Sequence, residues 1–179
     1  MARALIIGCG CRCRRLGKRL LAEGWAVRGT SRHEQGLAAI EAAGIEPAPA
    51  DPSRPETVLD LVGDVTVVAW MLGSAQGEPE ELSAIHGPRL DRLLERLVET
   101  PVRGFVYEAA GTVNPALLER GREAVTAAGD TWRIPVASIL VDPGDHVIWS
   151  DPLDAWTESA FGCVLEMTNE PKSLNSDRN

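Results

Sequence analysis

Short apolar runs and longer amphipathic stretches alternate along this chain. The first run, residues 3–8, is almost wholly apolar, as expected of a strand that is buried on both faces. The stretch after it places Leu16, Leu20 and Leu21 at helical spacing and ends at Gly24, a common stop signal for a helix. The same succession recurs through most of the sequence, which therefore predicts alternating strands and helices.

The boundaries follow from the apolar spacing and from local start and stop signals. We expect strands at residues 3–8, 25–30, 45–50, 64–72, 102–107 and 134–141. We expect helices at residues 14–23, 34–43, 54–62, 79–99 and 114–129, and a last helix within 145–167 that is interrupted near Asp151. Gly87-Pro88 should bend or restart the helix over 79–99. Asn114-Pro115 is a strong helix start, because asparagine caps the first turn and proline fits its first position.

Strands that alternate with helices pack as a parallel sheet between two layers of helices. The predicted fold class is therefore α/β, a three-layer, doubly wound parallel sheet of about six strands in the order 3-2-1-4-5-6. We expect one domain over residues 1–168 and a polar tail over residues 169–179.

The turn after the first strand carries the most specific motif. Gly8-Cys9-Gly10 follows a strand and opens a helix, the context in which a G-x-G-x-x-G pattern binds the pyrophosphate of a dinucleotide. Gly8 would make the tight turn, Gly10 would let the backbone approach the phosphates, and Arg12 would add a contact. Cys13 replaces the third glycine, but it is small and apolar, and Gly17 on the same helix face keeps the packing close. The alternative is an ordinary tight turn that binds nothing.

The end of the second strand bears on which dinucleotide would bind. NAD-selective domains hold the ribose 2′-hydroxyl with an acidic residue at this place, whereas this chain has Thr30-Ser31-Arg32. Two hydroxyls and a guanidinium suit a 2′-phosphate, so this segment favours NADP over NAD, which stays possible. The alternative explanation of Arg32 is a solvated side chain in a loop. Asp51 either approaches the adenine or caps its own turn.

With these motifs the sequence resembles the atypical short-chain dehydrogenases/reductases, the NAD(P)-dependent epimerase/dehydratase-like proteins. The resemblance rests on residues 8–17, 29–32 and 103–107 and covers roughly residues 3–141. It implies a Rossmann fold and adds cofactor contacts just after the fourth strand. The cofactor-binding residues that we expect are Gly8, Gly10, Arg12, Cys13, Ser31, Arg32, Ala69, Trp70, Met71 and Leu72.

The chain also departs from that family. Members catalyse with a Tyr-x-x-x-Lys pair, but the single tyrosine, Tyr107, lies inside the fifth strand and is followed four positions later by Gly111. The helix over 114–129 contains neither tyrosine nor lysine, and Ala109-Ala110 replaces the usual hydroxyl residues. The extended members also have a substrate-binding region at the C-terminal end, whereas we expect only a helix and a tail after the sixth strand. The resemblance therefore implies the fold of the family but not its reaction. We assign no catalytic residue.

Three residues are candidates for an improvised acid or base. His86 titrates near neutral pH, but we favour a helix-surface position for it, just before the Gly87-Pro88 break. Glu108 ends the fifth strand, at the edge where such sheets bind ligands; it would bind substrate or the nicotinamide ribose, or pair with an arginine. Thr112 is best explained as part of the turn before Asn114.

Composition and charge exclude several other classes. The chain has 179 residues, 44% of them hydrophobic, and a formal net charge of −8, which argues against nucleic acid as a partner. No apolar run approaches the about 20 residues of a membrane-spanning helix, and Met1-Ala2-Arg3 leads straight into a strand, so we expect no membrane association and a cytoplasmic location. Cys9, Cys11 and Cys13 have metal-ligand chemistry, but no second ligand cluster accompanies them, and we expect no metal.

The sequence thus predicts an NAD(P)-binding Rossmann protein, NADP-preferring and without Tyr/Lys catalysis. Two alternatives stay open: an active oxidoreductase or epimerase with an unconventional acid or base, and a protein-interaction domain that has lost the ligand. The leucine stripe over 90–97 either pairs with a second copy in a homodimer or packs on the sheet. The sequence names no small-molecule substrate.

Overall fold

The sheet has six parallel strands, as the computed structural model of the chain shows for residues 1–142 and 155–168. The strand order is β3-β2-β1-β4-β5-β6, which confirms the predicted doubly wound topology. The strands are β1 (Arg3–Ile7), β2 (Ala26–Ser31), β3 (Glu46–Pro49), β4 (Val67–Trp70), β5 (Gly104–Glu108) and β6 (Val136–Ile139). The order changes direction between β1 and β4, where Ile7 pairs with Trp70 and where such sheets bind ligands at their carboxyl ends.

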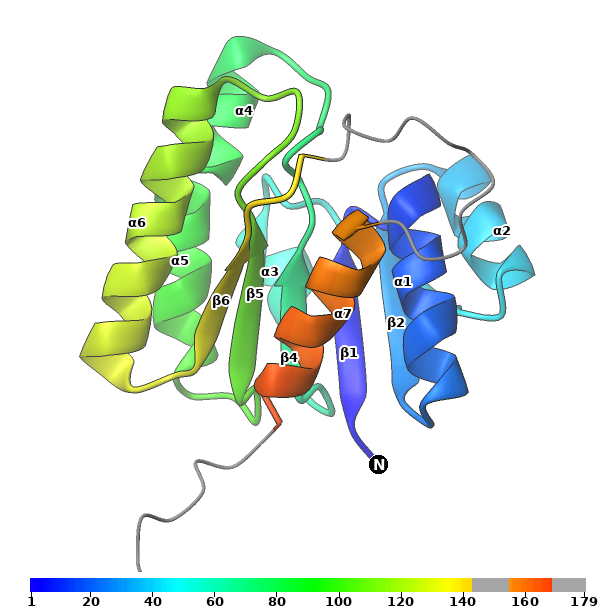
Figure 1. Cartoon of the computed structure of the whole chain (residues 1–179). Helices are drawn as coiled ribbons and strands as arrows, with labels where there is room; N and C mark the ends of the chain where they lie inside the picture. Colours follow the sequence, from blue (N-terminus) through cyan, green and yellow to red (C-terminus); the bar gives the residue numbers. More distant parts are fainter. Residues whose placement is uncertain (143–154, 169–179) are drawn as a thin grey trace, which may run out of the picture.

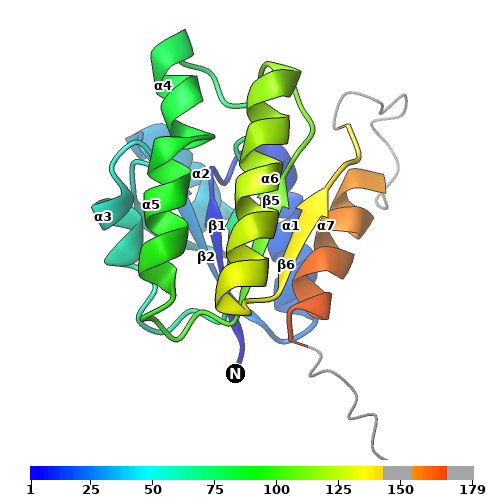
Figure 2. The ribbon, with the colours of Figure 1, turned by 90° about the vertical axis from the view of Figure 1, so that its left-hand side faces the viewer.

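Helices cover both faces of the sheet (Figures 1 and 2). One face carries α1 (Cys11–Ala22), α2 (Glu34–Ala42) and α7 (Ala155–Glu166); the other carries α3 (Pro55–Leu59), α5 (Pro88–Leu97) and α6 (Pro115–Trp132). The short helix α4 (Pro79–Ile85) continues the line of α5 beyond the carboxyl ends of the strands (Figure 2). It therefore stands beside the edge of the sheet where a ligand would bind.

The leucine stripe of α5 lies in the core. Leu90, Leu93 and Leu97 are buried and pack with Phe105 of β5. Of the two expectations for this stripe, packing on the sheet is therefore confirmed. The stripe cannot form the dimer surface, because its apolar side chains are already covered by this chain.

The elements differ from the predicted ones mainly at their ends. The helix expected over 79–99 is split at His86 and Gly87, as the Gly87-Pro88 pair predicted. Helix α1 starts at Cys11, three residues earlier than expected, because Gly10 already serves as its N-cap. Asn114 caps α6 as predicted: its side-chain oxygen accepts a hydrogen bond from Ala116 N at 2.9 Å. The interruption expected near Asp151 lies outside the described residues.

An ionic network joins three strands at the opposite, amino-terminal edge of the sheet. Arg28 of β2 bonds Glu46 of β3 at 2.8 Å and Asp64 before β4 at 2.9 Å. Arg3 of β1 pairs with the same two carboxylates. In the described parts of the chain, no helix is both long and apolar enough to cross a membrane.

Candidate functional site

The turn between β1 and α1 needs glycine at its first position. Gly8 has φ of +78°, a conformation that L side chains rarely adopt. A Cβ atom there would lie 2.6 Å from Leu72 Cδ2 and 2.7 Å from the Met71 carbonyl oxygen. Gly10 N donates to Gly8 O at 2.7 Å and closes the turn. The tight turn predicted for Gly8 is therefore present.

Strand β2 holds this turn from the side. Gly8 N donates to Thr30 Oγ1 at 3.2 Å, and Cys9 N donates to Thr30 O at 3.0 Å. A Cβ on Gly29 would lie 2.7 Å from Cys9 Sγ, so glycine at this position lets the turn approach the strand. The Thr30 hydroxyl, expected to suit a phosphate, is thus already used to shape the turn, and Ser31 supplies the remaining hydroxyl.

Helix α1 opens with backbone amides directed at the turn. Its first intrahelical bond runs from Arg14 N to Gly10 O at 3.0 Å, so the amides of residues 11–13 have no acceptor within the helix. The N-cap residue Gly10 has no side chain to accept their hydrogen bonds, and the first turn contains no acidic residue. An anion at this place would gain both hydrogen bonds and the favourable helix dipole.

Close packing of α1 depends on Cys13 and Gly17, as predicted. Cys13 is buried among the apolar side chains between α1 and the sheet. A Cβ on Gly17 would lie 2.4 Å from Ile45 Cδ1 and 3.5 Å from Val27 Cγ1. Gly17 therefore provides the close helix–strand approach that the third glycine of the motif normally gives.

Two cavities meet at the Gly8–Gly10 turn. The first has a volume of about 290 Å³, and the second has about 320 Å³. Both are lined by Gly8, Gly10, Leu72 and Ala75, so they adjoin each other at this turn. The first extends along β2 and α4, and the second extends toward the end of β5. Together they form a two-lobed cleft across the carboxyl edge of the sheet.

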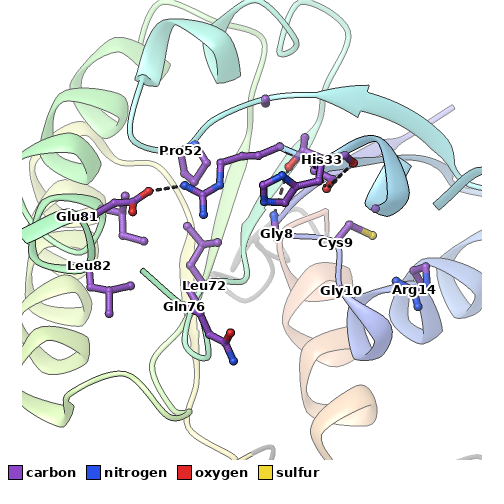
Figure 3. A pocket seen from close by; sticks show the side chains of 17 residues that line it. Gly8, Cys9, Gly10, Arg14, His33, Pro52, Leu72, Gln76, Glu81 and Leu82 are labelled. Carbon is purple, nitrogen blue, oxygen red and sulfur yellow. Dashed lines mark hydrogen bonds and ion pairs between the residues drawn. The ribbon is translucent and has the colours of Figure 1, made fainter. Parts of the chain in front are cut away.

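The first lobe is lined by charged side chains from three elements. Arg14 comes from α1, Arg32 follows β2, and Glu81 comes from α4. Figure 3 shows Glu81 on one side of the cavity and Gly10 and Arg14 on the other. Arg32 reaches across and forms an ion pair with Glu81. Ser31 also lines this lobe, where its hydroxyl bonds the His33 backbone N at 3.1 Å.

The second lobe is bounded by Arg12, which holds two neighbouring segments. Its Nη2 donates to Ser74 Oγ at 3.1 Å, and its guanidinium lies 5.7 Å from the ring centre of Trp156 on α7. The guanidinium therefore stands beside the open start of α1, as expected, with its position fixed by two contacts. Cys13 and Met71 also line this lobe.

Glu108 closes the inner end of the second lobe and is 2% exposed. Its Oε2 accepts a hydrogen bond from Gly73 N at 2.8 Å, and its Oε1 accepts one from Trp156 Nε1 at 2.9 Å. Burial raises the pKa of this carboxyl, although these two donors and the Arg12 charge act against the rise. Glu108 is thus a buried acid at the place expected from its position in the strand, in the field of Arg12.

His86 is not on the surface, contrary to our expectation. Its side chain is fully buried, with Nδ1 2.7 Å from Tyr107 Oη and Nε2 3.2 Å from Leu72 O. The helix break explains the difference, because α4 ends at Ile85 and the chain turns inward at His86. Burial lowers the pKa of His86 to about 4, against the hydrogen bond to Leu72 O, and burial raises the pKa of Tyr107.

Other expected site residues lie apart from the cleft. Ala69 and Trp70 are fully buried in β4 and line neither lobe, whereas Met71 and Leu72 do. Thr112 is exposed in the turn before α6, as its simpler explanation predicted. Asp51 caps its own turn by accepting hydrogen bonds from Ser53 N at 3.0 Å and Ser53 Oγ at 2.7 Å.

The three clustered cysteines lie in different environments. Cys9 and Cys13 are buried, whereas Cys11 is exposed at the start of α1 and lines the second lobe. Burial raises the pKa of Cys9 to about 12, although the Arg14 charge opposes it. Within residues 1–142 and 155–168, no three His, Cys, Asp or Glu side chains are grouped as a metal site.

Sequence reasoning missed the contacts between distant segments. Glu81, Ser74 and Trp156 contribute to the cleft through partners 49, 62 and 48 residues away in the chain. No local pattern marks these residues, because only the fold brings them to the Gly8–Gly10 turn.

Solved structures share the fold of this chain, whereas no protein-family model and no curated protein matches its sequence. A short-chain dehydrogenase/reductase superfamily protein from Agrobacterium tumefaciens with bound NAD is 17% identical, with 76% of this chain and 48% of that chain covered and a TM-score of 0.61. The UDP-glucose 4-epimerase of Thermus thermophilus in complex with NAD is 17% identical, with 76% and 53% covered and a TM-score of 0.64. This chain has the Rossmann fold of those proteins. Vestitone reductase from alfalfa is similar too, with 16% identity, 77% and 56% covered and a TM-score of 0.59. The chain spans about half the length of these similar structures.

Proposed function

We propose that this protein binds a nicotinamide dinucleotide across the Gly8–Gly10 turn. The observation that carries the proposal is the two-lobed cleft, whose lobes meet at a glycine turn and at the open start of α1. The pyrophosphate would lie at the amides of residues 11–13, beside Arg12, with the adenosine half in the first lobe and the nicotinamide half in the second. The NAD-bound structures that share the fold support this assignment.

We further propose that the protein prefers NADP to NAD. Arg32, Arg14 and Ser31 line the first lobe, where the adenosine ribose would lie. Two guanidinium groups and a hydroxyl match the charge and the hydrogen-bonding capacity of a 2′-phosphate. The ion pair between Glu81 and Arg32 acts against this preference.

The described residues support the proposal that the protein lacks the standard catalytic pair of such enzymes. Tyr107 points at α6, where a Cβ on Gly121 would lie 2.0 Å from its hydroxyl oxygen, and it bonds His86. The nicotinamide would supply hydride chemistry when bound, but among residues 1–142 and 155–168 no tyrosine or lysine side chain lines either lobe. We therefore favour binding without Tyr/Lys catalysis.

Calorimetric titration with NADPH and with NADH tests the assignment. The sharpest variant is Gly10→Val, because among the described residues beyond its chain neighbours only Gly8 O lies within 4 Å of the added Cβ, at 4.0 Å. The valine would fill the space where the lobes meet without disturbing the fold. Gly63→Val is the matched control, since nothing lies within 4 Å of its added Cβ and Gly63 lines neither lobe.

We expect NADPH to bind the natural protein and Gly63→Val, and to fail with Gly10→Val. Both variants should unfold within a few degrees of the natural protein. If neither dinucleotide binds the natural protein, the proposal is wrong, and the interaction-domain alternative takes its place.

One observation favours a second candidate function, redox or epimerase chemistry with Glu108 as its acid or base. Glu108 is the one of our three candidates that lines the second lobe, where the nicotinamide would lie. Screening carbonyl compounds for NADPH consumption, with Glu108→Gln as the comparison, tests it. A turnover that Glu108→Gln leaves unchanged would contradict this role.

A further inference from the structure

We propose that Glu81 is a specificity-determining residue that weakens binding of the 2′-phosphorylated dinucleotide by holding Arg32. This inference rests on the proposed function and concerns how the first lobe chooses between its ligands. The structure supplies three observations for it: a contact, a local charge balance and a position inside the cavity.

The contact links two walls of the first lobe. Arg32 follows β2, Glu81 belongs to α4, and the two residues form an ion pair although 49 positions separate them in the chain. Their side chains are 37% and 31% exposed, so the pair is neither free in solvent nor part of the core. Figure 3 shows Glu81 joined by a dashed line to the guanidinium group across the cavity. Arg32, the residue that we expect to bind the 2′-phosphate, therefore already forms an ion pair.

The charge around Arg32 is balanced by more than one carboxylate. Asp51 lies close enough for the Arg32 charge to act on it. Burial raises the pKa of Asp51, but the hydrogen bonds from Ser53 and the charges of Arg32 and Arg54 outweigh it and lower that pKa. Arg32 thus faces Glu81 in direct contact and Asp51 through space. Two carboxylates therefore already act on the positive charge of Arg32.

A 2′-phosphate and Glu81 would compete for the same guanidinium. To bind Arg32, the phosphate must displace a carboxylate that stays on the wall of the same cavity, where like charges repel. A ribose 2′-hydroxyl carries no charge and can donate a hydrogen bond to a carboxylate. Glu81 therefore opposes NADPH selectively and has little effect on NADH.

The chain offers a matched control one residue away. Glu80 lies on the same helix and is exposed, but it does not line the cavity. Glu81→Gln and Glu80→Gln remove the same charge from the same helix and preserve side-chain length. A difference between the two variants therefore reports the position of Glu81 and not the net charge of the protein.

The experiment is calorimetric titration of the natural protein and both variants with NADPH and with NADH, at low and at high salt. We expect Glu81→Gln to bind NADPH about tenfold more tightly, which is about 1.4 kcal/mol, and to bind NADH within about threefold of the natural protein. Glu80→Gln should change both affinities by less than about threefold. The tenfold gain should shrink at high salt, because screening weakens the repulsion that is removed.

Equal effects of the two variants would overturn the inference while leaving dinucleotide binding intact. So would a loss of affinity for both dinucleotides in Glu81→Gln, because that result would assign Glu81 a purely structural role on α4. Failure of the natural protein and of Glu81→Gln to bind either dinucleotide would instead refute the proposed function itself.

Discussion

Because His86 is buried, we predict that the protein becomes less stable as the pH falls. The ring is fully buried between Tyr107 and the Leu72 carbonyl. In the neutral ring, Nε2 donates to Leu72 O and Nδ1 accepts from the Tyr107 hydroxyl, so both nitrogens are satisfied. Protonation would place a charge in this buried position. Burial accordingly lowers the pKa of His86 from 6.5 to about 4.

Acid lowers the free energy of unfolding, because the unfolded chain binds a proton at His86 more readily than the folded chain does. Between about pH 6.5 and pH 4 the unfolded chain is protonated at His86 and the folded chain is not, so acid favours unfolding. The contribution of His86 to the free energy of unfolding is complete at alkaline pH and is lost as the pH falls through this window. At 1.36 kcal/mol for each pKa unit, the full loss is about 3 kcal/mol. Between about pH 8 and about pH 5 it is about 2 kcal/mol.

Urea unfolding at these two pH values, for the natural protein and for His86→Gln, measures the loss. Glutamine does not titrate, so the fall in the free energy of unfolding should be about 2 kcal/mol smaller in this variant, although the variant itself is less stable at alkaline pH. His33→Gln is the control, because His33 is exposed, and it should retain the full fall. If His86→Gln and the natural protein lose the same free energy, the burial argument is refuted.

Four further predictions concern the cleft and the helix packing beneath it. Arg32→Gln should weaken NADPH about tenfold and leave NADH nearly unchanged, as titration calorimetry would show. Gly17→Ala should destabilise the fold by about 1–3 kcal/mol in urea unfolding, because its Cβ would lie 2.4 Å from Ile45 Cδ1. Gly162→Ala, inside α7, should instead stabilise the fold by up to about 1 kcal/mol, because no described residue outside its own stretch of helix lies within 4 Å of the added Cβ. Cys11 is exposed on the second lobe, so bound NADPH should slow its alkylation, as mass spectrometry of the labelled protein would detect; equal rates would contradict the placement.

The parts of the site that the sequence predicted are those made by neighbouring residues. The turn at Gly8 and Gly10 and the close packing at Gly17 follow from residue types at fixed spacing, because local backbone geometry dictates them. The strand order followed from the alternation of elements, since right-handed crossovers leave few topologies. Each of these inferences needed only a short window of sequence.

The parts that the sequence did not predict depend on where distant segments meet. His86 looked like a surface residue of a long helix, but the break after Ile85 turns it into the core. The charge of Arg32 looked available for a phosphate, but Glu81 from α4 already pairs with it. A single sequence carries no signal for such contacts, because the pattern of an element does not reveal which element it faces.

Two neighbouring polar residues at the end of strand β5 have different surroundings. Tyr107 and Glu108 are neighbours, so their side chains point to opposite faces of the sheet. Tyr107 enters the core beneath α6 and bonds His86, whereas Glu108 faces α7 and bonds Trp156. Turning Tyr107 toward the second lobe would require a shift of register by one residue, which would turn every side chain of the strand to the wrong face. Glu108 is therefore the residue of this pair that lines the second lobe, whereas Tyr107 is part of the core.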